Sequence, residues 1–227
     1  MKAITILPLC FFFFIISGII SPSKKPPLII SKQMSHFTLK SDILKFFDFG
    51  IKRIYSDIIW IQTLLQSDLE HYKEKNGNSW MFYRFYTISN LDPLFIENYW
   101  YGGQYLSVIK DDKIGAKILF EKGLETYPND YRLLYYMGTH YLIELNDKKN
   151  AIKYYEKIFD YPSTPNHIKS LLTKLKEEEG HLMESYQLML QLYREAPEGP
   201  LKKVYLKRLN HLKNKIHLKH INHQIKK

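Results

Sequence analysis

The middle of the chain, between about residues 99 and 162, carries nearly the same pattern twice. A fixed period in the range of 20–50 residues is typical of stacked repeats, because one repeat unit cannot bury its apolar face alone. The repetition therefore predicts an array of helix pairs. The matching positions, all 35 residues apart, are Gly103 and Gly138, Ala116 and Ala151, Phe120 and Tyr155, and Glu121-Lys122 and Glu156-Lys157.

The 35-residue frame extends beyond these two units. Carried backwards from Phe120 it reaches Phe85, and carried forwards from Ala151 it reaches Tyr186, where the register is looser. Degenerate first and last units are usual at the ends of a stack. The sequence therefore predicts a repeat domain over residues 38–199, with units near 51–93, 94–128, 129–163 and 164–199.

Apolar residues spaced by threes and fours indicate where the helices lie. A helix is expected from Ile51 to about Lys73, with one face formed by Ile54, Ile58, Ile61, Leu65 and Leu69. A shorter face precedes it, formed by Leu39, Ile43, Phe46 and Phe47. Further helices are expected over Ser79–Asn90, which stops before Pro93, and over His181–Glu195.

Within one unit, the order aromatic, small residue, Ala, aromatic, Pro resembles the tetratricopeptide repeat. The residues that carry the resemblance are Tyr99, Gly103, Ala116, Phe120, Gly123 and Pro128 in one unit, and Leu134, Met137, Gly138, Tyr141, Ala151 and Tyr155 in the next. The resemblance covers about residues 51–197 and implies an all-α fold, a right-handed α-solenoid of helix pairs. The distance from Gly to Ala is one residue longer than in the common pattern, which places an extra residue in the turns at Asp111-Asp112 and Asn146-Asp147.

The resemblance also implies that the first helix of each unit lines a concave face. Aromatic, amide and guanidinium groups there would hold a protein or peptide partner through ring contacts and a few hydrogen bonds. The alternative is that Trp100 and Tyr135 only pack between units. The residues expected to form this groove are Glu97, Trp100, Gln104, Ser107, Arg132, Tyr135, Thr139 and Leu142.

The N-terminus begins with an apolar run from Ala3 to Ile20, just long enough to cross a bilayer. Residues 1–22 are interpreted as a signal anchor or a cleaved signal peptide, and residues 23–37, with Pro and Lys, as a spacer. The stretch Ser56–Ile61 is similar to one in membrane-anchored bacterial tetratricopeptide proteins. We expect a single-pass protein of a bacterial inner membrane with its body on the periplasmic side, although counting positive charges would place the body in the cytoplasm.

The C-terminal residues 200–227 contain nine Lys and Arg and no Asp or Glu, so they account for most of the net charge of +10. Tyr205, Leu209, Leu212 and Ile216 recur by fours and threes and predict an amphipathic helix. Two roles remain open: covering the last repeat, or binding an anionic surface, with phospholipid favoured over nucleic acid. The candidates for anion binding are Lys202, Lys203, Lys207, Arg208, Lys213, Lys215 and Lys219.

No catalytic motif is present: the sequence lacks a P-loop, a dinucleotide-binding glycine pattern, a zinc-protease motif and a nucleophile elbow. The single cysteine, Cys10, lies in the apolar run, so the repeat domain has no thiol. His217, His220 and His223 lie among lysines that repel a cation, and we expect no metal, cofactor or small-molecule substrate. The sequence thus predicts a non-catalytic, membrane-tethered scaffold that binds a protein or peptide; the alternative is a peripheral module whose basic helix binds anionic lipid or nucleic acid.

Overall fold

The computed structural model describes residues 29–30, 52–67, 70–71 and 77–225, and this part of the chain is almost entirely helical. The expected all-α fold is confirmed. The exception is a pair of two-residue parallel strands, β1 (Ile29–Ile30) and β2 (Glu70–His71), which the sequence did not predict. The helices are α4 (Lys52–Leu65), α5 (Trp80–Leu91), α6 (Ile96–Gln104), α7 (Lys113–Thr126), α8 (Tyr131–Ile143), α9 (Lys148–Ile158), α10 (Asn166–Glu178), α11 (Leu182–Glu195) and α12 (Pro200–Ile225). A π-helical turn, η1 (Tyr105–Ile109), continues α6.

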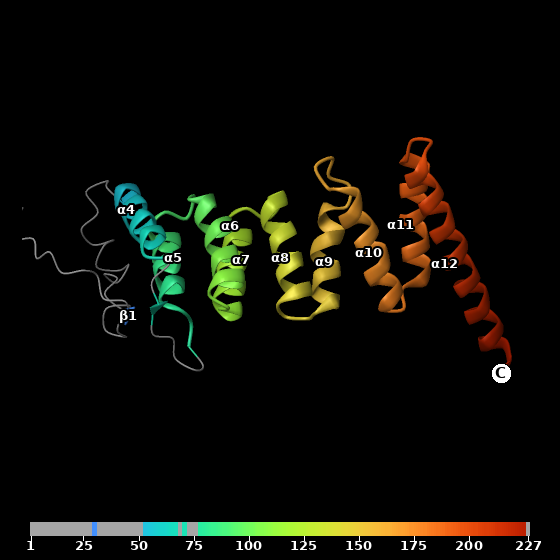
Figure 1. The fold of residues 1–227 in the computed structure, drawn as a ribbon, viewed down its shortest axis with the longest axis horizontal. Helices are drawn as coiled ribbons and strands as arrows, with labels where there is room; N and C mark the ends of the chain where they lie inside the picture. Colours follow the sequence, from blue (N-terminus) through green and yellow to red (C-terminus); the bar gives the residue numbers. More distant parts are fainter. Residues whose placement is uncertain (1–28, 31–51, 68–69, 72–76, 226–227) are drawn as a thin grey trace, which may run out of the picture.

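The helices stand side by side in chain order along the long axis of the molecule (Figure 1). Each packs mainly against its neighbours in sequence, so that α4 with α5, α6 with α7, α8 with α9, and α10 with α11 form successive pairs. The long α12 packs against α11 and continues past its end (Figure 1). One continuous core of Leu, Ile, Phe, Tyr and Met side chains runs through the row from α5 to α12.

The two middle pairs repeat each other in detail at the predicted 35-residue interval. Asp112 and Asp147 cap α7 and α9, each accepting a hydrogen bond from a backbone N–H three residues ahead at 2.9 and 3.0 Å. The residues before them, Asp111 and Asn146, have positive φ angles of 48° and 50°. Asp and Asn tolerate this left-handed conformation better than most residues. The turns at which the sequence placed an extra residue are therefore built in the same way.

Small residues let the paired helices approach each other closely. Ala116 and Ala151 have no exposed surface. A Cβ atom added to Gly138 would lie 2.8 Å from the ring of Tyr155, and one added to Gly103 would overlap the ring of Phe120. The aromatic ring of the second helix therefore fills the space that the glycine of the first helix leaves open.

The last pair follows the same scheme with a period one residue shorter. The frame pointed to Tyr186, but the fully buried residue at this place is Ser185, 34 residues after Ala151. Its hydroxyl donates a hydrogen bond to the carbonyl oxygen of Thr173 at 2.6 Å, and Thr173 stands 35 residues after Gly138. The cause is the turn between α10 and α11, residues 179–181, which is one residue shorter than the turn at 144–147.

Helix α4 differs from the prediction in two ways. It ends at Leu65 rather than near Lys73, and the apolar face that the sequence predicted does not face the core. Instead, Ser56 and Thr63 are buried, and the ring of Trp60 packs against Phe85 and Phe95, with ring centroids 5.5 and 5.3 Å apart. The outward side chains are Ile54, Ile58, Ile61 and Leu65, exposed by 57%, 45%, 55% and 76%.

Within the described ranges, none of the helices is long and apolar enough to cross a membrane. The apolar run at residues 3–20 and the expected helix over residues 38–49 lie outside these ranges, as does all of the spacer except Ile29 and Ile30.

The close approach at Gly103 can be tested by adding one methyl group. We expect Gly103→Ala to destabilise the protein, because the new Cβ overlaps the buried ring of Phe120. Overpacking of this kind costs about 1–3 kcal/mol, and each kcal/mol lowers the Tm by roughly 2–4 °C in a chain of this size. Thermal unfolding followed by circular dichroism measures the shift. Lys149→Ala, on the exposed side of α9, is the control, and equal Tm values for the two variants would contradict the packing described.

Candidate functional site

The residues expected to line a groove lie on α6, η1 and α8, at matching positions of two successive first helices. Glu97 and Arg132 are exposed, Ser107 is buried, and the other five side chains are half-buried. Counted at the 35-residue offset, Glu97 corresponds to Arg132, Trp100 to Tyr135 and Gln104 to Thr139. The structure therefore brings seven of the eight residues to the surface in two parallel rows.

Trp100 connects the two first helices. Its indole Nε1–H donates a hydrogen bond to Asp130 Oδ1 at 2.9 Å, and the guanidinium of Arg132 lies 4.4 Å from the centre of its ring. The same carboxylate oxygen of Asp130 accepts from the backbone N–H of Leu133 and caps α8. Trp100 thus stabilises the junction between units, while the exposed Arg132 covers its face. Trp100 therefore packs between units, which is the structural role that the sequence left open beside partner binding.

A cluster of tyrosines continues this surface along α8. The rings of Tyr131 and Tyr135 stack with centroids 6.2 Å apart, and Tyr136 meets Tyr135 edge-on at 5.4 Å. Tyr161, three residues after the end of α9, has its ring centroid 6.0 Å from that of Tyr131. Each of these rings is half-buried against the core, so each keeps part of its face available to a partner.

Ser107 does not line a groove, which corrects the prediction. Only 7% of it is exposed, because its hydroxyl points inward and lies 2.8 Å from Nδ1 of the buried His140. His140 Nε2 lies 3.0 Å from the carbonyl oxygen of Lys113, which can only accept, so Nε2 carries the proton. Nδ1 then accepts from Ser107. The pair connects η1, α7 and α8 inside the protein, and burial lowers the pKa of His140.

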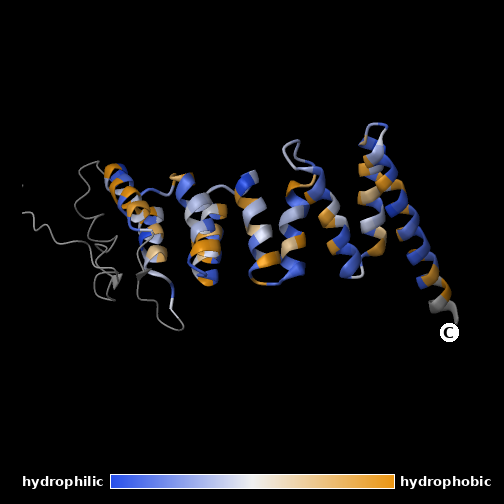
Figure 2. Cartoon of the chain, in the orientation of Figure 1, coloured by the Kyte–Doolittle hydropathy of each residue, from blue (hydrophilic) through white to orange (hydrophobic). Residues whose placement is uncertain are grey.

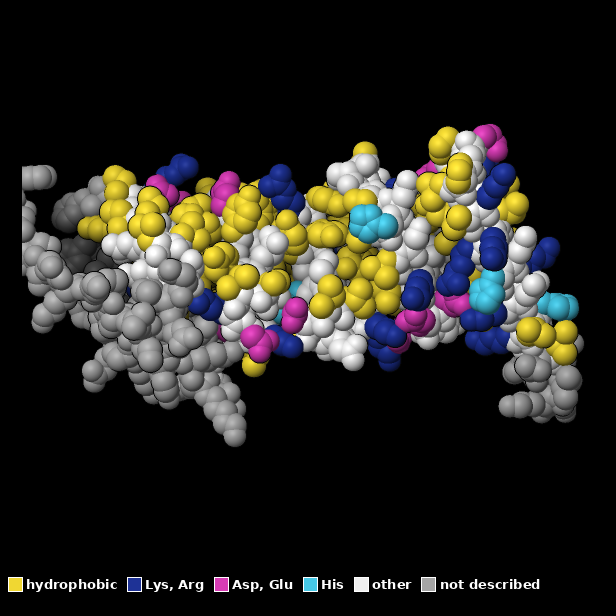
Figure 3. Space-filling model, in the orientation of Figure 1, with side chains coloured by type: hydrophobic (Ala, Val, Ile, Leu, Met, Phe, Trp, Pro, Cys, Tyr) yellow, Lys and Arg dark blue, Asp and Glu magenta, His cyan; other side chains and the backbone are white. Residues whose placement is uncertain are grey.

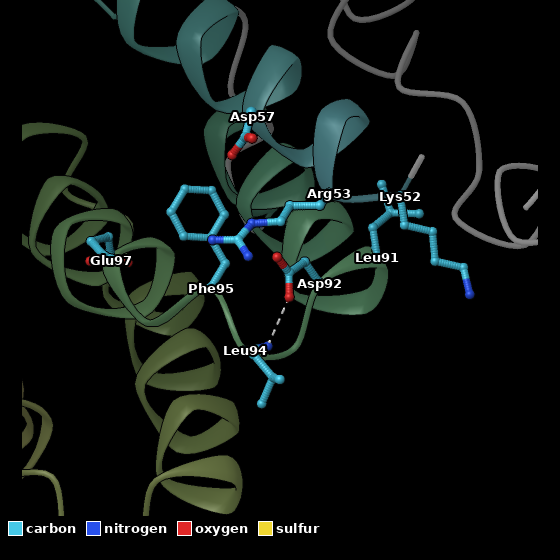
Figure 4. A pocket seen from close by; sticks show the side chains of 8 residues that line it. All are labelled: Lys52, Arg53, Asp57, Leu91, Asp92, Leu94, Phe95 and Glu97. Carbon is cyan, nitrogen blue, oxygen red and sulfur yellow. Dashed lines mark hydrogen bonds between the residues drawn. The ribbon is translucent and has the colours of Figure 1, made fainter. Parts of the chain in front are cut away.

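A pocket of about 400 Å³ opens beside Glu97, where the start of α4 meets the turn between α5 and α6 (Figure 4). Its lining combines apolar side chains with charged groups of both signs. In Figure 4, Arg53 reaches across the opening between Phe95 and Asp92. The sequence did not predict this pocket, because it depends on how α4 packs. The lining residues are Lys52, Arg53, Asp57, Leu91, Asp92, Leu94, Phe95 and Glu97.

The basic C-terminal segment forms α12 and covers α11. Tyr205, Leu209 and Leu212 are buried, as the predicted stripe requires, and Ile216 is half-buried. Figure 2 shows the rest of α12 as mostly hydrophilic, and Figure 3 shows Lys and Arg side chains gathered at this end of the molecule. The structure thus confirms that the helix covers the last repeat.

Glu177 on α10 connects this helix to α12 through ion pairs. Its side chain is only 7% exposed and forms ion pairs with Arg208 and Lys215, and His211 lies 3.5 Å away. Burial alone would raise the pKa of Glu177, but these basic groups hold it below its ordinary value. Glu177 is the first of three consecutive glutamates, residues 177–179.

The candidate anion-binding residues divide into two groups. Lys202 pairs with Glu198 at 2.7 Å, and Arg208 and Lys215 pair with Glu177. In the described part of the chain, no ion pair is formed by Lys203, Lys207, Lys213 or Lys219, all of which are exposed. Only this second group presents its charge freely to solvent.

No family model matches this sequence, and no curated protein matches it significantly. Among the described residues, no three His, Cys, Asp or Glu side chains come together as metal ligands would.

The buried His140 makes stability depend on pH. Burial lowers its pKa in the folded protein below the value of about 6.5 expected in the unfolded chain. Its stabilising effect is therefore complete above pH 6.5 and is lost as the pH falls below that value. We expect the free energy of unfolding of the wild type to fall more steeply between pH 7 and pH 5 than that of His140→Gln. Urea unfolding at several pH values measures both, and parallel pH profiles would contradict the assignment.

Proposed function

We propose that this chain is a non-catalytic scaffold of tetratricopeptide-like helix pairs, wound as a right-handed α-solenoid. The support for this is the repetition of caps, left-handed turns and glycine–aromatic contacts at 35 residues. In such an array the first helices line the concave face, and α6 and α8 are the first helices of the two middle pairs.

The proposed partner is a protein or peptide that lies across α6 and α8. The observation that carries this is the surface formed by Trp100, Arg132, Tyr131 and Tyr135, where half-buried aromatic rings surround an exposed guanidinium. Aromatic and arginine side chains dominate binding energy at protein interfaces. Because the rings are already fixed by packing and hydrogen bonds, little side-chain freedom would be lost on binding.

The scaffold is further proposed to be tethered to a bacterial inner membrane by residues 1–22, with its body on the periplasmic side. The support is the apolar run at the N-terminus and the resemblance of residues 56–61 to membrane-anchored tetratricopeptide proteins. Tethering would concentrate the scaffold near membrane-bound partners, which raises apparent affinity without any new contact.

Arg132→Glu tests the groove with little risk to folding, because Arg132 is exposed. An exposed cation–π contact contributes about 0.5–1 kcal/mol, so the fold should persist. We expect the variant to bind one specific partner at least tenfold more weakly, which corresponds to about 1.4 kcal/mol of binding free energy. Cross-linking in native membranes, followed by purification of the tagged full-length protein and quantitative mass spectrometry, measures this. Lys149→Glu on α9 is the matched control, and equal recovery of every partner with both variants would overturn the proposed site.

A second candidate function is binding of α12 to anionic phospholipid. It is favoured by the freely exposed Lys203, Lys207 and Lys213 on a helix whose opposite face is held by the body. Each basic residue close to an anionic membrane contributes about 1 kcal/mol.

Replacing these three lysines by Gln tests lipid binding without disturbing the buried stripe of α12. We expect binding to vesicles of phosphatidylcholine with 30% phosphatidylglycerol to weaken by at least about a hundredfold, since three charges near the surface are lost. The measurement uses the full-length protein, reconstituted into such vesicles, so that it does not require the helical part to fold by itself. Fluorescence quenching by labelled lipid then reports how close α12 lies to the membrane surface. The triple change at Lys149, Lys153 and Lys157 on α9 is the control. Unchanged quenching in the α12 variant would exclude this function.

A further inference from the structure

A cleft of about 290 Å³ lies between α9 and α11, the second helices of two successive pairs, next to α10. These three helices follow one another in the row (Figure 1). Apolar side chains line part of the cleft: Phe159 and Leu172 are buried, and Leu188 is half-buried. The ring of Phe159 already contacts one cation, since the ammonium of Lys169 lies 5.3 Å from its centre. The cleft therefore offers apolar walls on which a long side chain can lie.

Three carboxylates, those of Glu156, Asp160 and Glu184, line the same cleft. The side chain of Lys176, only 6% exposed, lines it too and forms ion pairs with both Glu156 and Glu184. Asp160 is exposed and forms no ion pair with any described residue; it accepts a hydrogen bond from an amide at 3.2 Å. Even with Lys169 counted, the carboxylates outnumber the ammonium groups. The cleft is therefore negatively charged, although the whole chain has a net charge of +10.

The preceding helix pair, α8 and α9, carries two aromatic rings at the matching positions. There the rings of Tyr141 and Tyr154 stack, with centroids 5.5 Å apart and an angle of 14° between their planes. Their counterparts are Lys176, 35 residues after Tyr141, and Leu188, 34 residues after Tyr154 because the turn before α11 is one residue shorter. Two stacked rings are thus replaced by side chains that cannot stack, and both replacements line the cleft.

The charges differ between the two junctions as well. Glu156 and Asp160 are preceded by carboxylates 35 residues earlier, so the acidic part of the pattern is repeated. Two lysines of α9, however, are replaced by glutamines at the matching positions of α11. The junction of α9 and α11 therefore keeps the carboxylates and lacks two of the cations present at the junction of α7 and α9. The exchanged residues are Lys153 and Lys157 in α9, and Gln187 and Gln191 in α11.

Apolar walls beside carboxylates suit the side chain of a lysine or an arginine. Such a side chain lays its aliphatic stem along apolar surface and keeps its charged end with polar groups. A hydrogen bond between a cation and a carboxylate is about twice as strong as one between neutral groups. The volume of about 290 Å³ lies just below the range of roughly 300–1,000 Å³ that is typical of small-molecule sites. An inserted side chain therefore fits the cleft better than a separate ligand does.

We propose that the cleft between α9 and α11 binds a lysine or arginine side chain from a basic segment of a partner protein. The cation is held by Asp160 and Glu156, and its stem lies on Phe159, Leu172 and Leu188. This inference does not depend on the proposed function, because the cleft shares no residue with the surface on α6 and α8.

Binding of a synthetic peptide to the full-length protein in neutral detergent tests the proposal. The probe is a fluorescently labelled helical peptide of Leu, Ala and Lys, and its control is the same peptide with Gln in place of every Lys. We expect the Lys peptide to bind at least about tenfold more tightly, because it alone supplies cations to the carboxylates. Fluorescence anisotropy measures both affinities, and equal values would overturn the proposal.

Two variants locate this binding in the cleft. Gln187→Lys combined with Gln191→Lys restores the charges found on α9, and Asp160→Asn removes the carboxylate that lacks an ion pair. We expect each variant to weaken binding of the Lys peptide at least about fivefold, with an unchanged Tm because the altered side chains are exposed or half-buried. Glu125→Gln, exposed and 35 residues before Asp160, is the matched control and should leave the affinity within about twofold. Equal affinities for the control and both variants would contradict the assignment.

Cross-linking distinguishes the cleft from other binding surfaces. With a photoreactive lysine analogue in the peptide, we expect products within residues 156–160 or 184–191, mapped by mass spectrometry. A product on α6 or α8 would place the peptide at the surface around Arg132 and would overturn this proposal. Sedimentation of the protein without peptide tests a second copy as the occupant. Self-association that is abolished by Gln187→Lys with Gln191→Lys would assign the cleft to the basic helix of another copy, and would equally overturn binding of a separate partner.

Discussion

The close approach of one helix to the next at small residues is the constraint on which the rest of the structure depends. Gly103 and Gly138 give room to the rings of Phe120 and Tyr155, and no larger side chain fits at these two positions without displacing a ring. Because interiors are packed as densely as organic crystals, these contacts fix both the distance and the rotation between paired helices. The turns and caps then follow, since Asp112 and Asp147 end the short loops that this geometry allows.

The sequence predicted the features that repeat and missed those that occur once. Periodic spacing identified the helical pairs, their buried small residues and the covering stripe of α12, because each depends on local pattern alone. The burial of Ser107 was missed because its cause is His140, 33 residues away. The ion pairs of Glu177 and the pocket beside Glu97 likewise depend on long-range packing. For α4, the apolar stripe was recognised, but no periodic signal shows which neighbour a stripe will face.

Charge and apolar surface are divided between the two ends of the row. The α12 end carries most of the net positive charge, part of it neutralised by Glu177, while the α4 end carries exposed Ile and Leu. The middle pairs, close to neutral, present aromatic rings around Arg132. The proposed binding face on α6 and α8 therefore lies apart from the surfaces at both ends of the row.

The shorter turn before α11 has a consequence for how such a chain can change. One residue fewer moved the buried position from the expected Tyr186 to Ser185, yet Ser185, Met189 and Leu192 remain within the core. The second helix of a unit is therefore positioned by its contacts and not by the length of the loop before it. The packing thus tolerates single-residue insertions and deletions in these turns. The number of residues in a unit can therefore change while its buried interior stays the same.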